Sequence, residues 1–103
     1  MKPFLYRLLP PRPTFALDMT ADERDVMQNH SSYLRGLAAK GEAIAFGPVL
    51  DPKGSWGVGI FQVESEARMK EIAGADPAIL SGRGFAYEIL PMAALVTGAA
   101  ATS

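Results

Sequence analysis

The chain has 103 residues, a net charge of −1 with both signs mixed along its length, and no cysteine. This length suits a single domain, the charge gives no footprint for nucleic acid or an anionic membrane surface, and the lack of cysteine excludes disulfides and thiolate chemistry. No apolar stretch approaches the roughly 20 residues of a membrane span, and the N-terminus has no signal-peptide pattern. We therefore expect a cytoplasmic protein.

The first half of the chain predicts a strand followed by a long helix. Pro3–Leu9 has strand character, and the proline-rich stretch at 10–13 ends any regular pairing. Thr20 and Glu23 have the spacing of a capping box, which predicts that a helix begins there. Gly41 is a suitable residue to end that helix.

The second half predicts a hairpin, a short helix, a helical turn and a last strand. A turn at 51–54 separates two strands, a serine caps the next helix, and an Asp-Pro pair starts another turn. These elements are the strands Ala43–Leu50 and Trp56–Val63, the helix Glu66–Ala73 after Ser65, the turn at Asp76–Pro77 and the strand Phe85–Leu90.

The order β-α-β-β-α-β is that of a ferredoxin-like α+β domain. It predicts a four-stranded antiparallel sheet with both helices on one face. The second and third strands carry apolar residues on both faces, so the uncovered face predicts a symmetric homodimer. We expect the domain to span residues 1–91 and an alanine-rich tail to span 92–103.

The only histidine, His30, falls on the apolar face of the first long helix, whereas Arg35 falls on the opposite, polar face. An imidazole directed into a core needs hydrogen-bond partners, because an unmade buried bond costs about 1–3 kcal/mol. One reading is a core histidine bonded to a backbone carbonyl. The other is a proton carrier that shares its space with a second polar group.

Asp76 is the candidate second group. Its carboxylate, just before Pro77, could simply cap backbone N–H groups. A carboxylate near His30 would also fix one tautomer of the ring and stabilise its protonated form. We expect the two side chains to lie on the same side of the sheet, within hydrogen-bonding reach across a cavity.

Four features in order along the chain resemble the YCII-related (YciI-like) family. They are His30 on the first helix, Gly41 after it, Ala45-Phe46-Gly47-Pro48 in the second strand and Asp76-Pro77 after the second helix, and the resemblance covers residues 4 to 91. It implies a dimeric α+β barrel with a histidine–aspartate pair, proposed to be catalytic, at His30 and Asp76. One activity known in the family is removal of chloride from a chlorinated hydroquinone.

Four further residues are candidates for substrate binding. Gly47 and Pro48 could hold backbone close to a ligand, or could mark a bulge or strand end. Tyr6 and Tyr33 could line the same cavity as the histidine, or could simply pack in the core. Arg83, between two glycines, could receive an anionic group or remain solvated.

Several chemistries are disfavoured by the sequence. One histidine and scattered carboxylates argue against a transition-metal site. Neither glycine-rich nucleotide motif occurs, nor does the nucleophile elbow of a serine hydrolase. We expect no cofactor.

The main hypothesis is therefore a small cofactor-independent enzyme of the lyase or isomerase type. His30 would be the general acid or base, Asp76 would orient it, and the substrate would be a small metabolite, with an aromatic one among the candidates. The alternative is a non-catalytic dimer that binds a small ligand or a partner, with a structural His30. A third reading, a cofactor-free monooxygenase, is analogy at the level of the fold.

Overall fold

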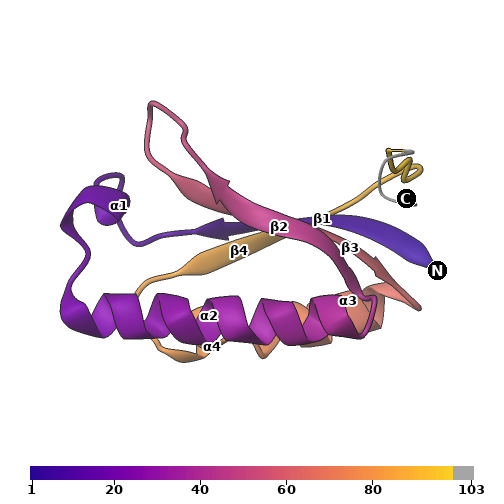
Figure 1. Ribbon diagram of the computed structural model, residues 1–103, viewed down its shortest axis with the longest axis horizontal. Coiled ribbons are helices and arrows are strands. Elements are labelled where there is room, and N and C mark those ends of the chain that lie inside the picture. The colour runs from indigo at the N-terminus through magenta and orange to yellow at the C-terminus, as the bar shows by residue number, and fades with distance from the viewer. Residues whose placement is uncertain (99–103) are drawn as a thin grey trace.

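The computed structural model describes residues 1–98 as one antiparallel sheet with helices packed on one side (Figure 1). The strands are β1 (Lys2–Leu9), β2 (Ala43–Val49), β3 (Trp56–Val63) and β4 (Ala86–Pro91), and the helices are α1 (Phe15–Asp18), α2 (Ala21–Ala39), α3 (Glu66–Gly74) and α4 (Pro77–Leu80). The predicted β-α-β-β-α-β order and α+β fold are confirmed. The short helix α1 was not predicted.

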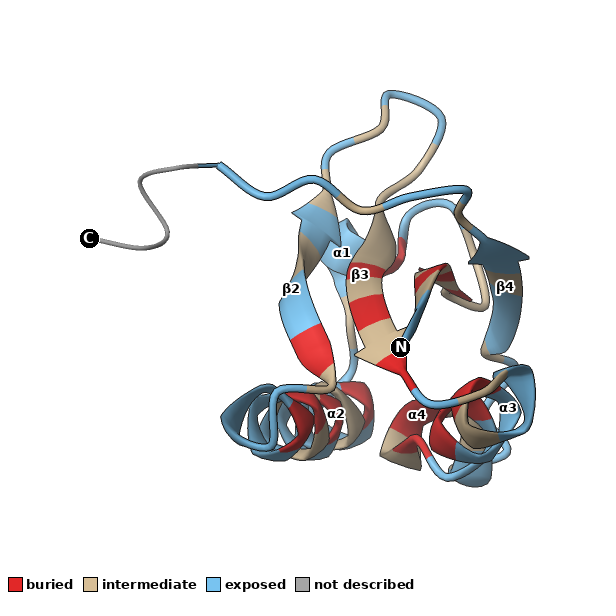
Figure 2. Cartoon of the chain, turned by 90° about the vertical axis from the view of Figure 1, so that its right-hand side faces the viewer, coloured by how far each residue is buried: buried red, intermediate tan, exposed pale blue. Residues whose placement is uncertain are grey.

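The sheet has the order β2-β3-β1-β4, with β1 in its interior. In the antiparallel register, Tyr6 lies opposite Gly59 on one side and Ile89 on the other. Since side chains alternate between faces, Phe4, Tyr6 and Leu8 point together towards the helices, where all three are buried. The helices thus cover one face of the sheet (Figure 2).

Local signals set the ends of α2 as predicted. Thr20 Oγ1 accepts a hydrogen bond from the backbone N–H of Glu23, and the Glu23 carboxylate accepts one from the backbone N–H of Thr20. Gly41, with φ of +82°, adopts a backbone conformation that favours glycine. Between these ends the helix turns His30, Leu34 and Leu37 into the core.

Boundaries differ from the predictions by one residue at several elements. β2 ends at Val49, because Leu50 already belongs to the exposed turn. β4 begins at Ala86 and includes Pro91, which lies at a sheet edge where a missing N–H costs no ladder bond.

The predicted tail begins without regular structure. Residues 92–98 form no helix or strand, and the backbone N–H of Met92 donates to the carbonyl of Pro3 over 3.0 Å. The rest of that tail, residues 99–103, lies outside the described residues. Within residues 1–98, no helix is both long and apolar enough to cross a lipid bilayer.

The face of the sheet away from the helices carries an apolar row across all four strands. Leu5 is paired with Ile60 on one side and Leu90 on the other, and Ile60 is paired with Ala45. None of the four is buried, and Leu90 is 50% exposed. The expectation of strands with two apolar faces is met here.

Candidate functional site

The candidate site is organised around the carboxylate of Asp76, which is only 1% exposed. Asp76 is the N-cap of α4, and its Oδ1 accepts a hydrogen bond of 2.9 Å from the backbone N–H of Ala78. Pro77 follows at the first helical position, where its missing N–H is not needed. The capping role expected for this aspartate is therefore present.

His30 meets this carboxylate from α2. Its Nδ1 lies 2.9 Å from Oδ1 and 2.8 Å from Oδ2 of Asp76, and the histidine is 8% exposed. The two residues are 46 positions apart in the sequence. The predicted proximity of the pair is confirmed, so His30 is bonded to a carboxylate rather than to a backbone carbonyl.

A third side chain completes the group from β1. The hydroxyl of Tyr6 donates a hydrogen bond of 2.7 Å to Oδ2 of Asp76. Burial raises the pKa of the Tyr6 phenol well above its ordinary value, and the negative charge of Asp76 raises it further. Tyr6 therefore keeps its proton and acts here as a donor.

These contacts fix the tautomer of the imidazole. Asp76 accepts a hydrogen bond from Tyr6 at Oδ2 and one from the Ala78 N–H at Oδ1, and Nδ1 of His30 lies within hydrogen-bond distance of both oxygens. Because the carboxylate acts as an acceptor, Nδ1 of His30 carries a proton. In the neutral ring the lone pair then lies on Nε2, the nitrogen that a substrate would meet.

His30 also lines a cavity of about 320 Å³ between α2 and the sheet, which Asp76 does not reach. Within residues 1–98, Nε2 of His30 has no protein hydrogen-bond partner, and it is not sealed from solvent as Nε of Arg7 is. The ring thus presents one nitrogen to a buried carboxylate and the other to open space.

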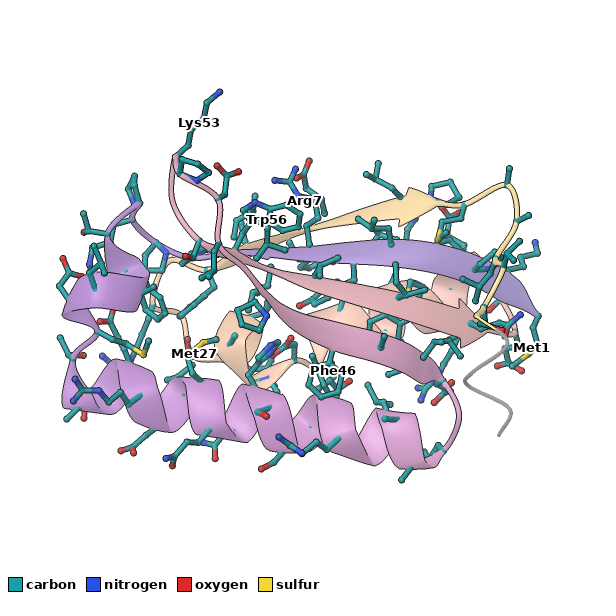
Figure 3. The ribbon with its side chains drawn as sticks, turned by 45° about the horizontal axis from the view of Figure 1, so that its top comes forward. Met1, Arg7, Met27, Phe46, Lys53 and Trp56 are labelled. Carbon is teal, nitrogen blue, oxygen red and sulfur yellow. The ribbon has the colours of Figure 1, made fainter. Side chains whose placement is uncertain are left out.

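The cavity brings together three of the four predicted binding residues. Tyr6, Gly47 and Pro48 all line it, with Phe46 beside them on β2. Figure 3 shows Phe46 and Met27 between the sheet and α2. A Cβ added at Gly47 would meet no atom within 4 Å, so this glycine leaves room that a larger residue would take.

Tyr33 is placed differently from the expectation. Its hydroxyl donates to the backbone carbonyl of Ile72 over 2.8 Å, and the residue packs against the core without lining the cavity. Burial, followed by the nearby Asp76, raises the pKa of this phenol. The contacts of Tyr33 tie α2 to α3.

The sequence analysis did not predict two polar residues that line the cavity. Ser31 and Arg35 both border the cavity on the same helix as His30. The helical wheel assigned Arg35 to the polar face, but its long side chain extends to the cavity from there. Arg83, the predicted alternative for an anion, instead pairs with exposed Asp22 over 3.3 Å.

Asp51 belongs to the hairpin turn and not to this cavity. It accepts hydrogen bonds from the backbone N–H of Lys53 and from Nε1 of Trp56, at 2.9 and 3.1 Å. Figure 3 shows Lys53, Trp56 and Arg7 on the side of the sheet away from α2. In the part of the chain described, no group of three or more histidine, aspartate or glutamate side chains gathers as metal ligands would.

The comparison with protein-family models agrees with this fold. The model of the YCII-related domain matches residues 4–93, close to the 4–91 of the resemblance. No curated protein matches the chain. Because the family model covers most of the sequence, the chain belongs to the YCII-related family.

Proposed function

We propose that this protein is a cofactor-independent enzyme in which His30 transfers protons to and from a small molecule and Asp76 orients it. One observation carries the proposal: Nδ1 of His30 is bonded to a buried carboxylate, while the residue lines a cavity of about 320 Å³ and its other ring nitrogen has no partner within residues 1–98. This arrangement suits an elimination, an isomerisation or a related lyase step.

The chemistry follows from the tautomer. Nε2 of His30 would remove a proton from the substrate, and the imidazolium formed would be stabilised by Asp76 at 2.8 Å. The same nitrogen would then return the proton to a different atom or to a leaving group. A positioned group of this kind typically contributes 10²–10⁴-fold to a rate.

Tyr6 and the Ala78 N–H support this step indirectly. Both donate to Asp76, one to each oxygen, so the carboxylate is held in place beside the imidazole. The apolar walls of the cavity, such as Leu8, Leu34 and Phe46, would exclude water from the reacting atoms.

The test begins with a thermal-shift screen of small metabolites on three proteins: wild type, His30→Ala and the control Asn29→Ala. Asn29 is exposed on the same helix and does not line the cavity. We expect a compound that raises the melting temperature of wild type and control but not of His30→Ala. NMR in D₂O should then show deuterium incorporation or conversion of that compound.

Other results would distinguish the enzyme from the alternative, a non-catalytic protein that binds a small ligand. A compound that binds wild type, yet neither exchanges protons nor reacts, would contradict the enzyme and leave a ligand-binding protein. If wild type converts a compound and His30→Ala converts it at the same rate, His30 is not the proton carrier.

We also infer that a second copy of the chain covers the outer face of the sheet. Proteins of the YCII-related family are generally dimeric α+β barrels, and Leu5, Ile60 and Leu90 form an unburied apolar row on this face. Light scattering should give twice the 11.0 kDa of the chain. Leu90→Arg should shift it to the monomer, and a wild-type monomer at micromolar concentration would contradict the inference.

A further inference from the structure

A second, smaller hollow adjoins the candidate site. It has a volume of about 120 Å³ and shares Leu8, Met27 and Pro48 with the main cavity. Phe15 and Phe85 also line it. We call this hollow the apolar annex, because Ser55 is the one polar residue among those that line it.

The wall of the annex is held by a charged residue outside it. Arg12 donates from Nε to Asp18 over 2.7 Å and from Nη1 and Nη2 to Glu23 over 2.8 and 2.7 Å. These bonds tie the proline-rich loop and α1 to the start of α2. Phe15 of α1 then packs edge-to-face on Phe85, with ring centroids 5.3 Å apart. The annex is therefore a built feature of the fold.

A positive charge lies at the opposite end of the main cavity. Arg35 lines it, is exposed, and forms no ion pair within residues 1–98; its Nε makes one long hydrogen bond of 3.3 Å, to Ser31. A guanidinium without a carboxylate partner has its paired donors available for an anion.

The three features follow one another in order along the axis of α2. With 1.5 Å of rise per residue, Met27 at the annex precedes His30 by about 4.5 Å, and Arg35 follows it by about 7.5 Å. The proton-transferring nitrogen thus lies between an apolar end and a cationic end. Such a site distinguishes the two ends of a ligand.

We propose that the ligand of this site is an amphipathic carboxylate. Its carboxylate binds the Arg35 guanidinium, its aryl or alkyl group fills the apolar annex, and the carbon between them lies at His30. The inference rests on the proposed function only for what happens at that carbon. The chemical character of the two ends of the ligand follows from Arg35 and the apolar annex, and does not depend on the proposed function.

The test measures equilibrium binding of three probes to the full chain by NMR titration at pH 7. The probes are 4-phenylbutyrate, the uncharged 4-phenylbutanol and the short butyrate. We expect 4-phenylbutyrate to bind at least tenfold more tightly than either of the others. Equal affinities for the acid and the alcohol, or no binding of any probe at millimolar concentration, would overturn the proposal.

Matched arginine variants locate the anion site. Arg35→Gln should remove the advantage of 4-phenylbutyrate over 4-phenylbutanol. Arg24→Gln removes the same charge from an exposed position of α2 outside both cavities, and should leave that advantage unchanged. Equal effects of the two variants would show only a general charge effect and would overturn the assignment.

Ala16→Phe locates the apolar end, because Ala16 lines the annex from α1. We expect it to weaken 4-phenylbutyrate about tenfold and to leave butyrate unchanged. If the variant does not fold, a series of straight-chain acids on wild type decides instead. Affinity should rise about fourfold per methylene until the annex is full, and an affinity independent of chain length would contradict the annex.

The same measurements separate this inference from the proposed function. Dependence on Arg35 and on chain length, with no proton exchange in any bound acid, would uphold the ligand class and reject the enzyme. Once a substrate is found, turnover that is unchanged in kcat and KM by Arg35→Gln would uphold the enzyme and reject the ligand class.

Discussion

Two buried carboxylates, Asp76 and Glu23, both bind a backbone N–H at the start of a helix, but they contact different side chains. Each satisfies a backbone N–H at the start of a helix, Asp76 that of Ala78 and Glu23 that of Thr20, both at 2.9 Å. They are 1% and 7% exposed. Asp76 is the N-cap of α4 and Glu23 completes the capping box of α2, so each stabilises the start of its helix.

Their side-chain partners make the difference. Glu23 holds the guanidinium of Arg12, which is always charged and has no lone pair to offer a substrate. Hydrogen bonds from Arg12 lower the pKa of Glu23 to about 2. Asp76 holds His30, which lines a cavity and whose other ring nitrogen has no partner within residues 1–98. A capping carboxylate thus supports proton transfer only when its partner is titratable and reaches open space.

Removal of His30 should have the largest effect. His30→Ala should lower turnover of an identified substrate by about 10²–10⁴-fold, because the proton carrier is lost. The space left on α2 should also cost about 1–3 kcal/mol of stability, so circular dichroism must first show that the variant is folded. A folded His30→Ala with wild-type turnover would remove the distinction between the two carboxylates.

The amide variants of the two carboxylates should affect different properties, turnover for Asp76 and melting temperature for Glu23. Asp76→Asn keeps the shape and a comparable capping ability but loses the charge that favours the productive tautomer, so we expect turnover to fall about 10²-fold. Glu23→Gln should leave turnover within about twofold, and should lower the melting temperature because Arg12 loses one of its two charged partners and keeps only Asp18. Turnover and thermal melts of both variants test this expectation. Equal turnover of Asp76→Asn and wild type would contradict the role of Asp76 in orienting His30.

Tyr6→Phe tests how much the hydrogen bond from Tyr6 to Asp76 contributes to turnover and stability. It removes one of three donors to the carboxylate, while the Ala78 N–H and His30 remain. We expect turnover to fall less than tenfold and stability to fall by about 1 kcal/mol. A loss as large as that of His30→Ala would mean that Tyr6 itself touches the reacting atoms.

The contribution of Glu23 to the pH dependence of stability should be visible as the difference between wild type and Glu23→Gln, because the pKa values of Asp18, Glu42 and Asp51 are lowered as well. The pKa of Glu23 is about 2 in the folded protein against an ordinary 4.5, so its contribution is present above pH 4.5 and is lost as the pH falls towards 2. Thermal melts of wild type and Glu23→Gln should therefore differ most near neutral pH and converge in acid. A difference that does not change between pH 7 and pH 2.5 would contradict the role of this ion pair.

The parts of the structure that were predictable come from local patterns. The capping box at Thr20 and Glu23, the Asp76-Pro77 helix start and the inward face of α2 at His30 are each encoded within a few neighbouring residues. The meeting of His30 with Asp76 depends on topology across 46 residues, and the resemblance to a family supplied it.

The parts that were missed depend on contacts between distant segments. Tyr6 bonds to Asp76 because the register of β1 directs it towards the helices, and spacing along one strand does not identify its partner. Helix α1 has four residues, too few for a periodic pattern, and Arg12 holds it in place. Arg35 reaches the cavity through the length of its side chain, which a helical wheel does not represent.

The interior position of β1 determines when this protein can fold. β1 is the first element of the chain, yet its neighbours are β3 and β4, and Phe4 is paired with Pro91. Contacts this distant in sequence require large loops to close, which slows folding relative to helical proteins. On the ribosome, β1 must therefore wait unpaired for most of the synthesis of the chain. The carboxylate of Asp76 and its partner Tyr6, 70 residues apart, can meet only after the start of α4 has been synthesised.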